Sequence, residues 1–181
     1  MRAFLVIEIP DELKPRILAV QDMLDDFDIK LVEGQNLHFN LKFLSEIDEE
    51  QIDKIKGTLE RISGQFEPFE MEIKGIGAFP NKSYARVVWL GVTEGYQTLK
   101  AIADLIGNFL VNMGFEKEQQ FVPHLTLGRV RSGRNKNELL VLLRKYENVE
   151  IGRMKVEKIT LFQSKLSPKG PIYEKVFEAN L

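Results

Sequence analysis

The chain has 181 residues, of which 44% are hydrophobic and 29% charged, so it can form a packed core and is not a disordered chain. It has no cysteine, which excludes disulfides and thiolate metal sites. Its 25 basic and 27 acidic residues give a formal net charge of −2, which argues against a long basic groove that follows many phosphates but leaves room for a local phosphate site.

The periodicity of the apolar residues predicts strands where they alternate and helices where they recur every three or four positions. The apolar run at 4–7 ends at Glu8 and is too short for a signal peptide or a membrane span, so we expect a soluble, cytoplasmic protein. In chain order we expect a strand at 2–9, a helix over 10–24, a short strand at 29–32, a strand at 37–43, a helix from Asp48 to about 62, strands at 68–78 and 84–92 with a turn at 79–83, a helix at 95–113, a strand at 121–130, a helix at 135–147, and strands at 152–163 and 171–179.

The only two histidines of the chain occur in similar tetrapeptides, His38-Phe39-Asn40-Leu41 and His124-Leu125-Thr126-Leu127. In an alternating strand, each histidine shares a face with the polar residue two places later. Either histidine alone could be an ordinary surface or core residue, but the shared spacing favours a site. Two imidazoles around one cleft are typical of acid–base chemistry near neutral pH.

Within the first histidine strand, alternation assigns one set of residues to the core, namely Leu37, Phe39, Leu41 and Phe43. The same alternation assigns the other set to the open face, namely His38, Asn40 and Lys42.

The two histidines are 86 residues apart, close to half of the chain, and no linker divides the sequence. We therefore predict one bilobal α+β domain over residues 1–181. Each of the two similar lobes would be an antiparallel sheet with helices packed outside, and one histidine strand from each lobe would line a central groove.

A basic cluster follows the second histidine motif and consists of Arg129, Arg131, Arg134 and Lys136. Such a run is often a solvated face, but its position beside His124 makes a phosphate site an equal alternative. Strict alternation would place Arg129 on the face opposite to that histidine. Either a bulge at Gly128 resets the face or the arginine reaches the groove from the strand end, and we favour the bulge.

At these residues the chain resembles the two-histidine phosphoesterases, most closely the LigT-type RNA 2′,3′-cyclic phosphodiesterases. The resemblance covers nearly the whole chain and lies in the segments 1–4, 38–44, 77–81, 86–89, 124–130 and 170–174. It implies a bilobal α+β fold with a central groove. It also implies hydrolysis of RNA 2′,3′-cyclic phosphate ends to 2′-phosphates without metal or cofactor, with RNA ends or cyclic nucleotides as substrates, no membrane partner, and a monomeric protein.

The resemblance further implies a role for each site residue. His124 would be the base that takes a proton from water, and His38 the acid that protonates the departing ribose oxygen. Asn40 and Thr126 would bind the phosphate, and Arg129 would offset the charge of the transition state.

The chain departs from the family pattern at two positions, since the family has threonine in place of Asn40 and usually glycine in place of Ser45. An asparagine amide can still donate a hydrogen bond to a phosphate oxygen. It is bulkier than threonine, however, so reduced activity or an altered substrate is an open alternative.

Two other functions are compatible with the same residues. One is a non-catalytic or weakened protein that binds RNA ends or nucleotides, and the other is a reversible 2′-5′ RNA ligase. A metal-dependent hydrolase is disfavoured, because two histidines without a matching carboxylate pattern make a poor metal site. Four aromatic residues could stack a terminal base, although core packing is their more usual role: Phe79, Tyr84, Trp89 and Tyr173.

Overall fold

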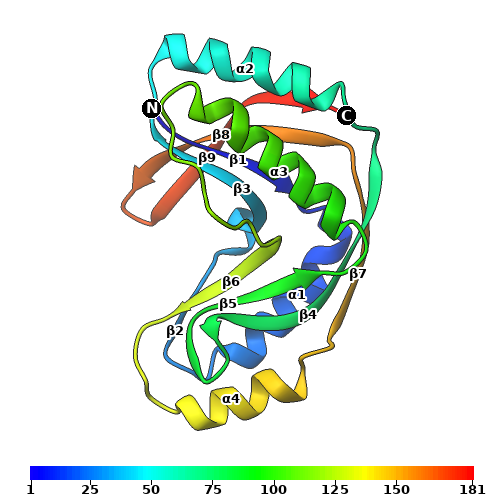
Figure 1. Cartoon of the computed structure of the whole chain (residues 1–181). Helices are drawn as coiled ribbons and strands as arrows, with labels where there is room; N and C mark the ends of the chain where they lie inside the picture. Colours follow the sequence, from blue (N-terminus) through cyan, green and yellow to red (C-terminus); the bar gives the residue numbers. More distant parts are fainter.

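The computed structural model describes all 181 residues and confirms the α+β class. Nine antiparallel strands form one curled sheet that bends around a concave side, with α2 and α4 at opposite ends of the molecule (Figure 1). None of the helices is long and apolar enough to cross a membrane. The strands are β1 (Arg2–Glu8), β2 (Ile29–Leu31), β3 (His38–Glu46), β4 (Phe69–Asn81), β5 (Tyr84–Val92), β6 (His124–Val130), β7 (Glu150–Val156), β8 (Lys158–Ser167) and β9 (Gly170–Asn180), and the α-helices are α1 (Lys14–Leu24), α2 (Glu49–Ser63), α3 (Tyr96–Val111) and α4 (Lys136–Lys145).

The sheet consists of two halves that meet at the two histidine strands. The upper lobe in Figure 1 contains β3, β1, β8 and β9, and the lower lobe contains β7, β4, β5 and β6, with β2 paired to β6. A single residue pair, Phe39 with Leu125, joins β3 to β6. The two expected sheets are therefore halves of one continuous sheet.

The two lobes exchange helices. In each case the helix follows a strand of one lobe but packs against the other lobe. Helix α1 follows β1 but lies on the lower lobe, where Arg16 donates to the carbonyl of Ile151 (2.8 Å) and Gln21 donates to those of Val32 (2.8 Å) and Leu127 (3.0 Å). Helix α3 follows β5 but packs on α2 and β3 of the upper lobe. Because of this exchange, we expect the lobes to fold together as one domain.

The strand expected at 152–163 is wrong as a single element. It is two strands, since β7 pairs with β4 of the lower lobe, whereas β8 pairs with β1 of the upper lobe. The chain crosses between the lobes at Glu157. In β7 exposed residues separate the buried Ile151, Met154 and Val156, whereas after this residue β8 buries the three consecutive residues Ile159, Thr160 and Leu161. Elsewhere the expected turn at 79–83 shrinks to two residues, and β6 begins only at its histidine.

The second histidine strand contains the expected bulge. Its pairing with β5 passes from Thr126 directly to Gly128, so Leu127 is an extra residue. Leu127 and Gly128 are both buried, and the exposed Arg129 falls on the face of His124. A Cβ at position 128 would lie 2.9 Å from the backbone of β2, which explains the glycine. The bulge predicted at Gly128 is confirmed.

The first histidine strand contains an equivalent bulge that the sequence pattern did not reveal. Its pairing with β1 passes from Asn40 to Lys42, so Leu41 is the extra residue. Leu41 and Lys42 are both buried, and Phe43 is 55% exposed on the face of the histidine. The expectation that Phe43 is buried and Lys42 faces outward is therefore wrong. The Lys42 ammonium donates to the carbonyl of Glu116 (2.6 Å) instead.

Ser45 has a φ of 56°, in the left-handed region that favours glycine. We predict that Ser45→Gly raises the free energy of unfolding by about 0.5–1 kcal/mol, because a strain of roughly 1–2 kcal/mol is relieved and part of it is offset by the greater freedom of the unfolded chain. Asn135 has a similar φ of 58°, but asparagine tolerates this region, so Asn135→Gly should gain less. Urea denaturation of both variants tests this, and an equal or lower stability of Ser45→Gly would show that φ imposes no strain there.

Candidate active site

The two histidine motifs lie on adjacent antiparallel strands where the lobes meet. Phe39 and Leu125, the pair that joins them, are fully buried, so the residues on either side of them face the concave side. Extending this register by one residue in each direction places each histidine opposite the polar residue of the other motif: His38 opposite Thr126, and His124 opposite Asn40. The strands thus bring together the four motif residues that the sequence singled out.

His124 is held in the tautomer that suits a base. Its Nδ1 lies 2.7 Å from the carbonyl oxygen of Val122. A carbonyl only accepts hydrogen bonds, so Nδ1 carries the proton and Nε2 offers a lone pair. Burial lowers the pKa of His124, the Val122 carbonyl opposes this, and the positive charge of Arg129 lowers it further. The imidazole is therefore neutral and basic at Nε2 near neutral pH.

His38 is also neutral near neutral pH. Burial lowers its pKa to about 4, against the opposing effect of a hydrogen bond to the backbone of Asn36. The ring is flanked by those of Phe4 (centroids 5.2 Å apart) and Tyr173 (5.6 Å). An anionic phosphate placed beside this imidazole would stabilise its charged form and raise its pKa.

Aromatic rings enclose the second histidine in the same way. Phe79 lies edge-on to His124 with centroids 4.9 Å apart, and Trp89 lies at 6.2 Å. A Cβ at Gly77 would come within 2.5 Å of the indole, so the glycine gives Trp89 its space. Three of the four expected stacking residues therefore lie against the histidines, and only Tyr84 lies apart.

Two buried side-chain polar atoms of the molecule have no hydrogen-bond partner, and both belong to this site. They are Oδ1 of Asn40 and Nε1 of Trp89. Leaving a buried polar atom unpaired costs roughly 1–3 kcal/mol. Such a cost at one place indicates a site built to be completed by a polar ligand.

Arg129 supplies positive charge on the same face. Its side chain is exposed, forms no salt bridge, and lies across the ladder from Lys30, so two like charges face each other. Like charges in directly opposed positions destabilise a sheet. This uncompensated positive charge is therefore consistent with binding of an anion.

Sequence reasoning missed Phe43 as a site residue. Phe43 follows the first histidine by five positions, as Arg129 follows the second, and the equivalent bulges put both on the concave face. Its ring stacks on that of Phe4 with centroids 5.7 Å apart. The shared five-residue spacing was a signal that could have identified it.

A cavity of about 290 Å³ adjoins the first histidine. Its lining includes Glu8, Lys14, Asn36, His38, Phe162 and Tyr173. No three histidine, aspartate or glutamate side chains come together in a group that could hold a metal ion.

A family model described as LigT like Phosphoesterase matches the chain twice in succession, over residues 7–89 and 90–173. The chain is 41% identical over 175 residues to the RNA 2′,3′-cyclic phosphodiesterase of Methanothermobacter thermautotrophicus, covering 96% of this chain and 95% of that protein. It is 41% identical over 178 residues to the protein of the same name from Methanocaldococcus jannaschii, covering 98% and 99%. The crystal structure of TT0787 from Thermus thermophilus has the same fold, with a TM-score of 0.83 at 25% identity over 100% of this chain and 98% of that one.

Proposed function

We propose, since this chain belongs to the LigT-like phosphoesterase family, that it is an RNA 2′,3′-cyclic phosphodiesterase that opens the cyclic phosphate at an RNA end and leaves a 2′-phosphate. The observation that supports this most strongly is the register of β3 and β6, which sets each histidine opposite the polar residue of the other motif. Two proton-transfer groups on one face can act on the two sides of a single phosphate.

The attacking water would be activated by His124. Its Nε2 lone pair is free because Nδ1 is committed to the Val122 carbonyl. As the water oxygen bonds to phosphorus, its proton passes to Nε2. Burial, and to a smaller extent the charge of Arg129, lower the pKa of this histidine, so the imidazole is in its basic form before the attack.

The departing ribose oxygen would be protonated by His38. The bond between phosphorus and the 3′ oxygen breaks, the proton of the imidazolium passes to that oxygen, and the phosphate stays on the 2′ oxygen. This places the terminal nucleoside on the His38 side, where the 290 Å³ cavity has room for it. Tyr173 and the exposed Phe43 offer ring faces for a base.

The nonbridging phosphate oxygens would be held by Asn40, Thr126 and Arg129. The Thr126 hydroxyl and the Arg129 guanidinium are donors. The Asn40 amide also becomes a donor when it is turned over, so that its nitrogen takes the position of the unpaired Oδ1. Donors aimed at developing charge in a partly enclosed site lower the barrier of the reaction. All five residues come from one chain, so we propose that a monomer carries out the reaction. We also propose that the protein acts in the cytoplasm.

The mechanism needs no Lewis acid, so we propose that hydrolysis is independent of metal ions. The test is to incubate the protein with RNA that ends in a 2′,3′-cyclic phosphate in the presence of EDTA and to assign the phosphate position in the product. We expect a 2′-phosphate at an unchanged rate. A 3′-phosphate would contradict the assignment of the leaving oxygen, and loss of turnover restored by one divalent ion would contradict metal independence.

The same assay separates the alternative functions. An RNA-end binding protein would retain the RNA but leave the cyclic end intact even with the protein in excess. A ligase would join the cyclic end to an added RNA with a 5′ hydroxyl through a 2′-5′ bond faster than water opens it.

The pH dependence should differ between kcat/KM and kcat. The ratio reports the free enzyme, in which the pKa of His38 is about 4, so the protonated acid is lost as pH rises above that value. The bound phosphate raises this pKa, so the alkaline limb of kcat should lie at higher pH than that of kcat/KM. Both profiles are measured on the same cyclic-phosphate RNA, and coincident limbs would show that His38 is not the acid.

Substitutions of Asn40 test whether the first motif touches the phosphate. Asn40→Thr should keep or raise turnover, because a threonine suits a strand and its hydroxyl is a compact donor. Asn40→Ala should lower turnover, since it removes a donor to a charged group worth about 1.5–3 kcal/mol. If the alanine variant matched the native protein, this residue would not contact the phosphate. A clearly slower threonine variant would instead indicate a substrate to which asparagine is adapted.

A further inference from the structure

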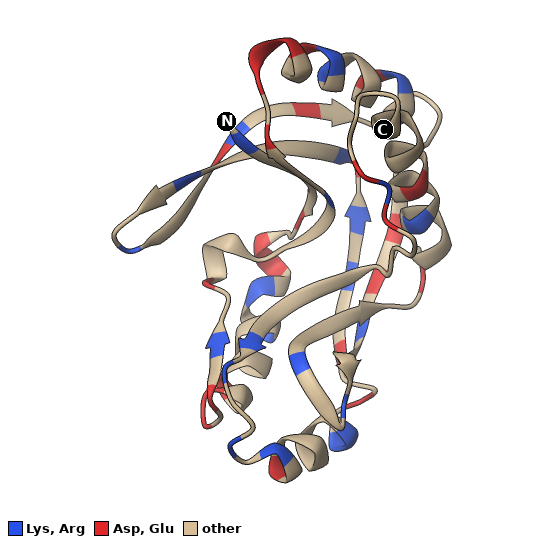
Figure 2. Cartoon of the chain, turned by 60° about the vertical axis from the view of Figure 1, so that its left-hand side comes forward, with Lys and Arg blue, Asp and Glu red and all other residues tan.

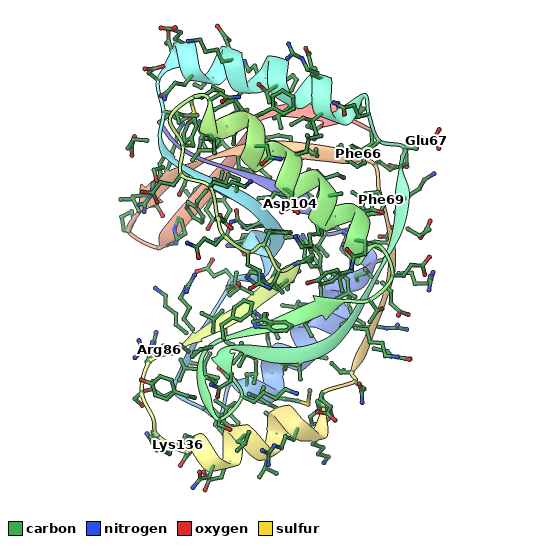
Figure 3. All side chains as sticks on the ribbon, in the orientation of Figure 1. Phe66, Glu67, Phe69, Arg86, Asp104 and Lys136 are labelled. Carbon is green, nitrogen blue, oxygen red and sulfur yellow. The ribbon has the colours of Figure 1, made fainter.

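A second concavity, which we call the basic groove, lies on the lower lobe next to the active site. Its volume is about 630 Å³, and it lies between the β4–β5 hairpin and the loop that leads from β6 into α4. Figure 3 shows Arg86 and Lys136 on the side of the lower lobe toward which the concave face of the sheet opens. The groove is lined by six basic side chains, Lys82, Arg86, Arg129, Arg131, Arg134 and Lys136.

The charge of the basic groove contrasts with that of the whole chain. The chain has a net charge of −2, yet no aspartate or glutamate lines the groove. Lysine and arginine follow one another along the loop into α4 (Figure 2). Of the six cations only Lys82 forms a salt bridge, with Glu147 (3.2 Å). Asp28 lies at this loop but accepts a hydrogen bond from the Ser132 hydroxyl (2.7 Å). Five of the six cations therefore have no acidic partner in the protein and can bind an anionic ligand.

The basic groove continues from the active site, because Arg129 belongs to both. This arginine lies on the face of His124, and the remaining cations line the groove from the β4–β5 hairpin and from the loop that leads into α4. The terminal nucleoside lies on the His38 side in the proposed function, so the RNA strand would turn back at the 5′ phosphate of that nucleoside and pass over Arg129 to reach these cations.

One aromatic side chain distinguishes a nucleic acid from other polyanions. Tyr84 lines the groove and is 57% exposed. Arg86 lies over its ring at 5.1 Å and donates to its hydroxyl at 2.7 Å, which fixes the ring in place. Cations interleaved with an exposed aromatic ring are typical of surfaces that bind single-stranded nucleic acid.

We propose that the basic groove binds the backbone of single-stranded RNA beyond its cyclised end, so that the substrate is an oligonucleotide rather than a cyclic mononucleotide. This inference rests on the proposed function and extends it. With five or six cations, the groove would contact a few phosphates, which fits a local site in a weakly acidic protein.

The test compares two double variants of the same helix region. Arg134→Gln with Lys136→Gln removes an arginine and a lysine at the start of α4, inside the groove. Arg144→Gln with Lys145→Gln removes the same two residue types at the other end of α4, outside it. The substrates are a ten-nucleotide RNA and a dinucleotide, each ending in a 2′,3′-cyclic phosphate.

We expect the groove variant to raise KM for the ten-nucleotide RNA by roughly tenfold at low salt. The slope of the logarithm of its RNA-binding constant against the logarithm of the salt concentration should become shallower by about 1.4, or 0.7 for each lost contact. Its kinetics on the dinucleotide should equal those of the native protein, and the control variant should resemble the native protein on both substrates. An equal effect of the two variants, or an effect on both substrates alike, would overturn the proposal.

Binding of the ten-nucleotide RNA without a terminal phosphate, followed by fluorescence anisotropy, separates this proposal from the proposed function. Weaker binding by the groove variant alone supports the groove even if the protein hydrolyses nothing. In a competition experiment, polyglutamate of matched charge should displace the labelled RNA only at a higher concentration than unlabelled RNA does. Displacement at the same concentration would overturn the proposal, since the groove would then recognise negative charge of any kind, including that of an acidic protein.

Discussion

His124→Ala and His38→Ala should each lower kcat/KM on RNA with a 2′,3′-cyclic phosphate end by on the order of 10²–10⁴-fold, the usual contribution of a positioned proton-transfer group. The reason for His124 is the free Nε2 lone pair that its bond to the Val122 carbonyl creates. The reason for His38 is that it lines the cavity proposed for the terminal nucleoside and belongs to the strand of the other lobe, β3.

The control for these two variants is their stability. Neither histidine holds the sheet together through a side-chain salt bridge, so both variants should fold and keep the native circular dichroism spectrum. Near-normal turnover of either variant would refute the acid–base assignment. A variant that failed to fold would indicate that its histidine is a core residue, and His38→Gln and His124→Gln would then be compared in its place.

Arg129→Ala should lower kcat by about 10²–10³-fold, the effect of removing one donor to the charge of a transition state. Arg129→Lys should recover only part of the loss, because an ammonium lacks the planar fork of the guanidinium. Arg129→Ala also removes a positive charge near His124, so the pKa of that histidine should rise and the acid limb of the pH profile should move to higher pH.

Arg131→Ala is the matched control for this prediction, since Arg131 lies two residues further along in the basic groove. On a dinucleotide substrate it should behave like the native protein. If Arg131→Ala lowered kcat on the dinucleotide as much as Arg129→Ala, general positive charge would matter and Arg129 would have no specific contact with the phosphate.

The sequence was sufficient to predict the fold class, most elements and the pairing of the two histidines. Alternation is a local signal, and both His38 and His124 lie in strands where it is clear. The bulge at Gly128 was also predictable, because an arginine on the wrong face required one and a glycine was available.

Features that depend on distant partners were not predictable in the same way. The bulge in β3 lacks a glycine, so nothing local indicated that Lys42 turns inward and Phe43 outward. The crossing at Glu157 is set by pairing with distant strands, since β7 pairs with β4 of the lower lobe and β8 with β1 of the upper lobe. The basic groove needed Lys82 and Arg86 from a hairpin far from the cluster in sequence.

The most direct test of the two-histidine mechanism is the single-turnover rate of the double variant His38→Ala with His124→Ala, compared with both single variants on the same cyclic-phosphate RNA in EDTA. Groups that act as a unit on one phosphate give strongly non-additive losses. We therefore expect the double variant to be about as slow as the slower single variant. Losses that multiply in full would mean that the two histidines act independently, and this would contradict their action as one acid–base pair.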